Sequence, residues 1–220
     1  MNSIEIWSDL VCPFCYIGKR NLETALQKMG MEESVQIEWK SFQLDPEAKK
    51  ATIENPISTY EYLSKKYGKP LGWAKQITFQ TAETAKKVGL DLNFEKAINT
   101  NTMDAHRLLH FAKSQNKQGE LKERLLKAHF TEGLNLSDFN VLARLASDVG
   151  LDSGAVLKIL DSEEYVADVQ EDAETAQGLG ATGVPFFVFN RQYAISGAQP
   201  VEAFQQVLAK VREDGSRPVG

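Results

Sequence analysis

Hydrophobic and polar positions near the N-terminus follow the periods of a strand, a helix and a second strand. Residues 3–8 contain a short apolar run, and residues 35–44 alternate apolar with polar side chains. Between them, apolar residues recur at helical spacing from Leu22 to Met29, and Gly30 ends the run. This part of the chain is therefore predicted to be β-α-β.

The middle of the chain has a different pattern. From Asp45 to Ser162, helical patterns follow one another and no strand of comparable quality is found. One helix is expected over residues 102–113, and another over residues 137–150 with Ser137 as its N-cap. This stretch is predicted to be an all-helical block.

Strand patterns return near the C-terminus. Residues 162–180 have the apolar face of a helix, and two apolar runs then flank Asn190–Gln192 as an expected hairpin. A last helix is expected to begin at Pro200.

The sum of these elements predicts an α/β protein of the thioredoxin fold, with a four-stranded mixed sheet, flanking helices and a large all-helical insertion. We expect a discontinuous thioredoxin-fold domain over residues 1–45 and 163–220, and an inserted helical domain over residues 46–162.

The amino-acid composition and net charge argue against some classes of function. The 220 residues are 42% hydrophobic and 25% charged, with a formal net charge of −5, which argues against a nucleic-acid surface or a polybasic membrane anchor. The start of the chain lacks the pattern of a signal peptide, and no window approaches about 18 uninterrupted apolar residues. We therefore expect a cytoplasmic protein whose partners are proteins or small molecules, with no membrane or nucleic-acid partner; the sequence leaves its oligomeric state open.

Both cysteines of the chain lie where the first strand passes into the first helix, in the segment Cys12-Pro13-Phe14-Cys15. A helix N-terminus favours a thiolate, so we expect a lowered pKa for Cys12 and assign it as the attacking thiolate. Cys15, one turn further along, would be the less exposed, resolving thiol. Pro13 suits the first helical position, and Phe14 offers a substrate an apolar contact.

Other interpretations of the pair stay open. The two cysteines could be core residues that share a turn by chance, or could bind zinc with His106 and His110, although nothing in the sequence brings these pairs together. The histidines could equally pack or form hydrogen bonds on their helix. Asp9 could accept a proton, cap the helix or be a solvated turn residue.

A second signal is Val184-Pro185. The proline stands directly before a predicted strand, where it cannot donate a hydrogen bond to a sheet, and its place in the topology favours a cis bond.

The segments "DLVCPFCYIGKRNLE", "NTMDAHRLLHFA" and "ATGVPFFVFNRQYAISGAQP" resemble the DsbA family of thioredoxin-like oxidoreductases, specifically its FrnE-type members. These are relatives of 2-hydroxychromene-2-carboxylate isomerases and kappa-class glutathione transferases. The resemblance implies that Val184 and Pro185 form the cis-proline loop facing the cysteines, with Val184 as the docking point for a peptide. It also implies that the helical insertion covers the cleft.

The leading functional prediction is a thiol-disulfide oxidoreductase or isomerase that acts on protein or small-molecule disulfides and dithiols. It has no bound cofactor and no metal, with glutathione as a candidate co-substrate. Because Pro-Phe replaces the Pro-His of the periplasmic oxidants, a strongly oxidising potential is not expected. The alternatives are a glutathione-dependent isomerase or transferase, and a non-catalytic peptide-binding or chaperone module.

Overall fold

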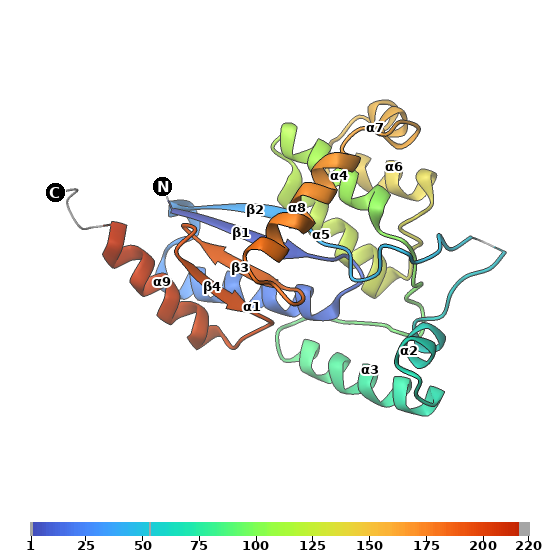
Figure 1. The fold of residues 1–220 in the computed structure, drawn as a ribbon, viewed down its shortest axis with the longest axis horizontal. Coiled ribbons are helices and arrows are strands. Elements are labelled where there is room, and N and C mark those ends of the chain that lie inside the picture. Colours follow the sequence, from blue (N-terminus) through green and yellow to red (C-terminus); the bar gives the residue numbers. More distant parts are fainter. Residues whose placement is uncertain (1, 53, 216–220) are drawn as a thin grey trace.

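The computed structural model describes residues 2–52 and 54–215. In chain order its elements are β1 (Asn2–Ser8), α1 (Pro13–Met29), a 3₁₀ turn (Glu32–Ser34), β2 (Val35–Ser41), α2 (Thr59–Tyr67), α3 (Leu71–Lys86), α4 (Met103–Ser114), α5 (Gln118–Lys127), a π-helical turn η2 (Ala128–Glu132), α6 (Phe139–Ser147), α7 (Ser153–Leu160), α8 (Val166–Gly178), β3 (Phe186–Phe189), β4 (Tyr193–Ser196) and α9 (Val201–Gly215). Figure 1 shows the sheet between α9 at one end and the helices that follow β2 at the other.

The sheet has four strands in the order β2-β1-β3-β4. β1 and β2 are parallel, with Ile4 opposite Ile37, and α1 supplies the crossover that parallel neighbours require. β3 runs antiparallel to β1, and β4 completes a hairpin whose turn residues Asn190 and Arg191 have φ of 48° and 54°. The predicted mixed sheet and thioredoxin fold are therefore confirmed.

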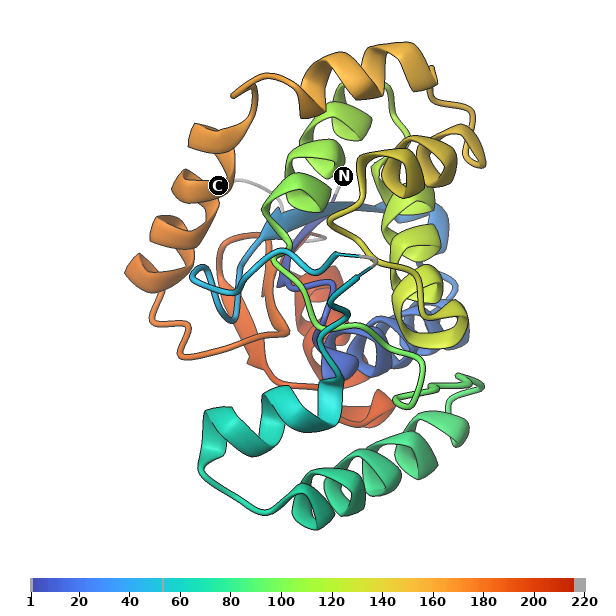
Figure 2. The ribbon, with the colours of Figure 1, turned by 90° about the vertical axis from the view of Figure 1, so that its right-hand side faces the viewer.

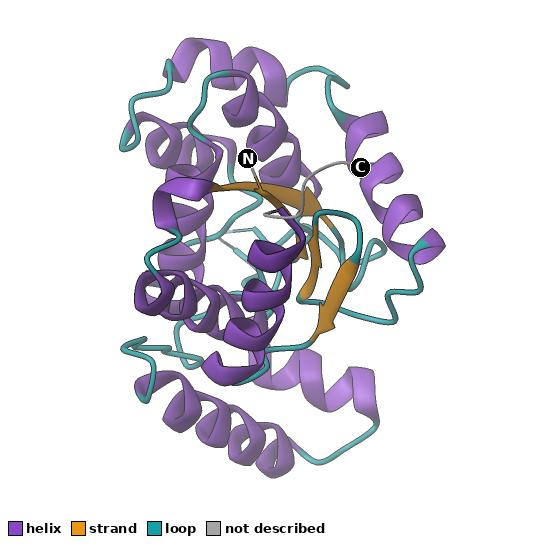
Figure 3. Cartoon of the chain, turned by 90° about the vertical axis from the view of Figure 1, so that its left-hand side faces the viewer, coloured by secondary structure: helices purple, strands orange, loops and turns teal. Residues whose placement is uncertain are grey.

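Helices cover both faces of the sheet (Figure 3). Alternate strand residues such as Ile6 and Phe187 pack against α1 and α9, where Phe204 lies with its ring centroid 4.9 Å from that of Phe187. The residues between them, such as Trp7, face the opposite way and pack near Ala176 of α8. Both faces of the central strands are thus buried, which accounts for their apolar content.

The first turns of α1 belong to a second core. Leu10, Tyr16 and Ile17 pack with buried side chains of α4, α5, α6 and α7, whereas the later turns of α1 pack on the sheet. Helices α2 and α3 lie together at one edge of the molecule (Figure 2), where Ala85 of α3 joins this second core and α2 has no buried residue. The beginning of α1 is thus fixed by the helices that lie between β2 and α8 in the chain.

The start of α6 differs from the prediction. Asp138, not Ser137, is the N-cap, and its carboxylate accepts hydrogen bonds from the backbone N–H groups of Asn140 and Val141. The Ser137 hydroxyl is turned inward instead, where it bonds to Ala51 O. A buried acceptor thus competes for the serine, and the neighbouring aspartate caps the helix.

Gly18 determines how closely α1 approaches the loop before β3. A Cβ atom at this position would lie 3.0 Å from Phe187 and 3.1 Å from Pro185. We expect Gly18→Val to lower the free energy of unfolding by about 1–3 kcal/mol, because the added methyl groups overpack this contact. The measurement is urea unfolding followed by circular dichroism.

The matched control is Gly119→Val in the first turn of α5, where no atom lies within 4 Å of the added Cβ. Its stability should stay the same or rise by a few tenths of a kcal/mol. Equal effects of the two substitutions would show that the close approach at Gly18 is unimportant.

Candidate active site

The two cysteines lie at the N-terminus of α1, as predicted. Cys12 is the N-cap residue with extended backbone (φ −94°, ψ 109°), Pro13 follows at the first helical position, and the Cys15 N–H donates to Cys12 O at 3.1 Å. Both thiols are free, and the residues are 3% and 1% exposed, so the expected difference in exposure is small. Cys12 is reached through a cavity rather than from the open surface.

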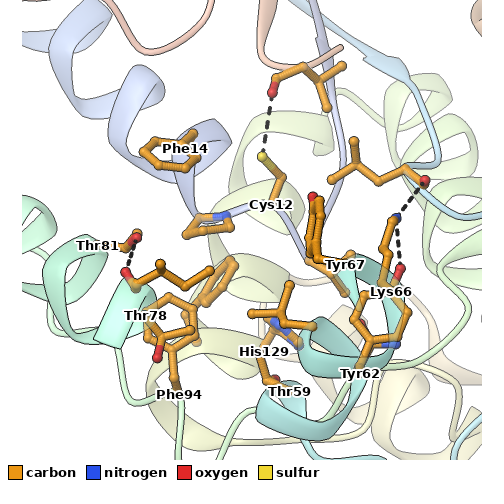
Figure 4. Close-up of a pocket in the computed structure, with 18 of the residues that line it drawn as sticks. Cys12, Phe14, Thr59, Tyr62, Lys66, Tyr67, Thr78, Thr81, Phe94 and His129 are labelled. Carbon is orange, nitrogen blue, oxygen red and sulfur yellow. Dashed lines mark hydrogen bonds between the residues drawn. The ribbon is translucent and has the colours of Figure 1, made fainter. Parts of the chain in front are cut away.

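The loop before β3 lies directly against Cys12. The Val184–Pro185 peptide bond is cis, and the Cys12 thiol lies 3.6 Å from Val184 O, within donating distance (Figure 4). Residues 172 positions apart in the sequence are thereby brought together at one sulfur. The carbonyl oxygen of Val184 is thus directed at the Cys12 sulfur.

A cavity of about 460 Å³ opens beside Cys12. This is the size of a pocket for a small organic molecule or a few side chains. Cys12 is part of its wall and Cys15 is not. Phe14, 47% exposed, lies at its edge, and Figure 4 shows side chains of α2 and α3 across from it. Its aromatic lining residues are Phe14, Tyr62, Tyr67, Trp73, Phe94 and Phe130.

The two thiols titrate as a pair. Their mutual hydrogen bond and burial raise the pKa of Cys12 well above its ordinary value. Burial also opposes ionisation of Cys15, but the hydrogen bond from Cys12, the positive charge of Lys122 and the Ser8 hydroxyl together lower the pKa of Cys15. Of the two sulfurs, Cys15 therefore has the surroundings that favour the thiolate more.

This distribution corrects the sequence-based expectation, which gave the lowered pKa to Cys12. As N-cap residue, Cys12 makes no side-chain hydrogen bond to the helix N–H groups. Its sulfur instead lies against a carbonyl oxygen and the Cys15 sulfur, two acceptors that favour S–H over S⁻. The direction in which the Cys12 side chain points therefore affects its pKa more than its proximity to the helix N-terminus does.

Asp9 is buried beside the pair, at 1% exposure. Its carboxylate accepts hydrogen bonds from Leu10 N at 2.7 Å, Leu44 N at 2.8 Å and His106 Nε2 at 3.3 Å. Burial opposes the charge, but the bonds from His106 and the backbone lower the pKa of Asp9. The solvated-turn and helix-cap interpretations are therefore wrong, since Asp9 holds the loop after β1 against α4.

The other predicted histidine lies in a different cluster. His110 Nε2 is 3.1 Å from Ser41 Oγ and 3.2 Å from Asp172 Oδ2. Both partners meet the same ring nitrogen, so this serine, histidine and aspartate cannot relay a proton as a catalytic triad does. Among the residues the structure describes, no three His, Cys, Asp or Glu side chains are placed to hold a metal ion.

Two residues near the pair were missed in the sequence. Lys122 of α5 is completely buried. His129, in η2, lines the cavity and is 2% exposed, and burial lowers its pKa to about 4, so its imidazole is neutral near pH 7. The sequence does contain a pattern that indicates burial of Lys122, because Leu125 and Leu126 follow it at the spacing of one helix face. No comparable pattern marks His129.

A thioredoxin-type sheet with a Cys-x-x-Cys pair at the start of α1 and a cis-proline against it defines a thioredoxin-like protein. The chain belongs to the family with a DSBA-like thioredoxin domain, whose model matches residues 3–209. It is similar to the uncharacterized protein YwbO of Bacillus subtilis, with 30% identity over 94% of this chain and 95% of that one. Within the described residues, no helix is long and apolar enough to cross a membrane.

Two solved structures agree with this assignment. The probable DsbA oxidoreductase SCO1869 from Streptomyces coelicolor superposes with a TM-score of 0.91 and 34% identity, over 100% of this chain and 93% of that one. A 2-hydroxychromene-2-carboxylate isomerase superposes with a TM-score of 0.73 and 16% identity, over 97% and 98% of the two chains. The second likeness concerns the fold alone. The predicted resemblance to the DsbA family is confirmed.

Glu123 of α5 joins the helical block to α1. Burial opposes its charge, but hydrogen bonds from Arg20, Lys19 and Tyr16 lower its pKa to about 2. This folded-state pKa lies below the unfolded value of about 4.3, so the contribution of Glu123 to stability is present above pH 4.3 and is lost as the pH falls toward 2. We expect Glu123→Gln to lower the free energy of unfolding at pH 7 by about 1–2 kcal/mol, an amount reduced by partial solvent exposure.

Urea unfolding at several pH values measures this effect, and the difference from wild type should shrink between pH 4.3 and 2. The control is Glu120→Gln on the same helix, whose exposed ion pair with Lys117 at 3.2 Å should contribute less than about 0.5 kcal/mol. A pH-independent effect of Glu123→Gln would contradict the assigned ion pairs.

Proposed function

We propose that this protein is a thiol-disulfide oxidoreductase or isomerase in which Cys12 and Cys15 cycle between dithiol and disulfide. The observation that carries the proposal is the position of Cys12, which combines a place in the wall of a substrate-sized cavity with contact to the carbonyl before a cis-proline. Membership of the DSBA-like family supports chemistry of the oxidoreductase or isomerase type.

The difference in access from the cavity supports different roles for the two sulfurs. Cys12 attacks a substrate disulfide from the cavity wall, and as it does so its proton passes to the Cys15 thiolate across their hydrogen bond. One substrate sulfur leaves as a thiolate, and the other stays bound to Cys12 as a mixed disulfide. Cys15 then attacks Cys12 Sγ and gives its proton to the second substrate sulfur, so the substrate gains the two electrons that the pair loses. The reverse steps oxidise a dithiol.

The loop of Val184 and Pro185 orients the substrate. In the reduced protein Val184 O lies near the Cys12 thiol. A substrate peptide in extended conformation could replace this contact by donating its own N–H to the carbonyl, as an added strand does at a sheet edge. Pro13 and Phe14 would contact the substrate from the start of α1.

The cavity favours substrates that are apolar next to their disulfide. Its aromatic lining comes from α1, α2, α3 and η2 and from the segment before α4. Lys66, a cation of this lining, already donates to Leu44 O at 3.3 Å and to Tyr62 Oη at 2.9 Å. Glutathione, which is charged at both ends, therefore suits the role of a co-substrate that regenerates the pair better than the role of occupant of the cavity.

Single cysteine substitutions test the roles of the sulfurs. With glutathione disulfide as the probe, Cys15→Ser should accumulate a mixed disulfide on Cys12, since nothing resolves it, whereas Cys12→Ser should form at least tenfold less adduct because Cys15 does not reach the cavity. The measurement is mass spectrometry after quenching with an alkylating agent.

Faster adduct formation at Cys15 than at Cys12 would reverse the assignment. If the wild-type protein forms no Cys12–Cys15 disulfide, and glutathione remains on Cys12, the glutathione-dependent isomerase or transferase becomes the better proposal.

A charge placed in the cavity tests the preference for apolar substrates. Ile77, on the cavity side of α3, is half-buried. We expect Ile77→Asp to lower kcat/KM for reduction of the uncharged aromatic disulfide 4,4′-dithiodipyridine at least tenfold, because binding would bring apolar surface against a carboxylate. The equilibrium of the cysteine pair with glutathione should stay unchanged.

The control is Phe79→Asp on the same helix, at a side chain that is 66% exposed and outside this cavity. It should retain wild-type kcat/KM within about twofold. Equal losses in both variants would refute the cavity as the binding site.

A further inference from the structure

Lys122 is buried without a hydrogen-bond partner. It lies on α5, is 0% exposed, and its Nζ atom finds no donor or acceptor partner among the residues the structure describes. Its ammonium lies 5.3 Å from the centroid of the Trp39 ring on β2. An aromatic face attracts a cation but does not replace the hydrogen bonds lost from water, so this position is costly unless an anion is near.

The anions near Lys122 belong to the cysteine pair and its surroundings. Cys15, Asp9 and Cys12 act on it as negative groups, and Lys19 opposes them. His106, on α4, also senses its charge. Asp9 is already satisfied by two backbone N–H groups and His106. The Cys15 thiolate is favoured by the thiol of Cys12 and the hydroxyl of Ser8, and Lys122 is the cation that lowers its pKa.

We propose that Lys122 is a positioning residue for the redox chemistry, a buried cation whose main counter-charge is the thiolate of the Cys12–Cys15 pair. The proposal rests on the proposed function in that it assumes the pair is redox-active. When Cys15 of the reduced protein is ionised, the ammonium and the thiolate compensate each other. When the pair transfers two electrons to a substrate disulfide and the S–S bond forms, the sulfur charge disappears and the ammonium remains buried with less compensation.

This arrangement favours the reduced state over the disulfide. It makes the pair a stronger oxidant of dithiols than it would be without the cation. Burial lowers the pKa of Lys122 to about 8, and the neighbouring anions act against a larger decrease, so the side chain is charged near pH 7. The cation comes from the helical block, which thereby contributes to the electrostatics of the sulfurs.

Lys122→Met tests the proposal, because methionine fills a similar volume without charge and leaves no polar atom unpaired. In the reduced variant the lower thiol pKa, measured by thiolate absorbance at 240 nm, should rise by at least one unit, which is a tenfold loss of thiolate stabilisation. The equilibrium constant for oxidation by glutathione disulfide at pH 7 should shift at least threefold toward the protein disulfide.

Stability of the two redox states gives an independent measurement. Lys122→Met should stabilise the oxidised protein against urea more than the reduced protein, a difference that loss of packing alone would not produce. Lys122→Gln, a second neutral variant, should shift the thiol pKa in the same direction. The control is Lys117→Met at the start of the same helix, which removes the lysine of an exposed ion pair with Glu120 at 3.2 Å and should affect both redox states equally.

The proposal would be overturned by Lys122 variants that fold but keep the wild-type chemistry of the pair. In such variants the thiol acid dissociation constant and the equilibrium constant with glutathione would both match those of wild type within about twofold. The thiol titration needs no disulfide. If the wild-type protein formed no Cys12–Cys15 disulfide, the proposed function would fail while the titration still decided whether Lys122 is the counter-charge.

Discussion

Burial of ionisable groups at the junction of β1 and α1 is the constraint on which this site depends. Asp9, Cys12 and Cys15 are each 3% exposed or less. In such surroundings a charge persists only where partners compensate for the lost water. Asp9 is compensated by backbone N–H groups and His106, and the thiolate by Cys12, Ser8 and Lys122. His106 and Lys122 come from α4 and α5, so the sheet and α1 alone could not provide the environment of the pair.

This dependence gives the helices between β2 and α8 two roles. Through α2 and α3 they form the far wall of the cavity, where apolar side chains face Cys12. Through α4 and α5 they fix the electrostatics behind the sulfurs, and Glu123 ties α5 to α1 by its ion pairs with Lys19 and Arg20. Under the proposed function, substrate binding and thiol acidity therefore depend on different helices, so that either property could change while the other is kept.

The sequence contains most of the fold because the fold follows from local periods. Strands with alternate residues such as Ile4 and Ile6, helices ended by residues such as Gly30, and a cysteine pair where strand passes into helix are all visible without tertiary information. The sequence does not show, however, which partner a single polar side chain bonds to in the folded protein. Ser137 bonds inward and leaves capping to Asp138, and Asp9 bonds to a histidine nearly a hundred residues away. Lys122 shows the same limit, since a lysine on an apolar helix face gives no indication of the sulfur behind it.

The cysteine that lines the cavity is not the one whose surroundings favour the thiolate, and this has a chemical consequence. Cys12 lines the cavity but its thiol points to acceptors, whereas the surroundings of Cys15 favour the thiolate in a position behind the cavity wall. A protonated sulfur is a poor target for oxidants, so under the proposed function this arrangement would protect the accessible cysteine until a substrate arrives. A substrate that takes over Val184 O removes one acceptor from the Cys12 thiol and leaves the Cys15 sulfur as the remaining one. In the proposed mechanism, transfer of the proton to Cys15 then produces the nucleophile at the sulfur that the substrate touches, so substrate binding itself would promote formation of the attacking thiolate.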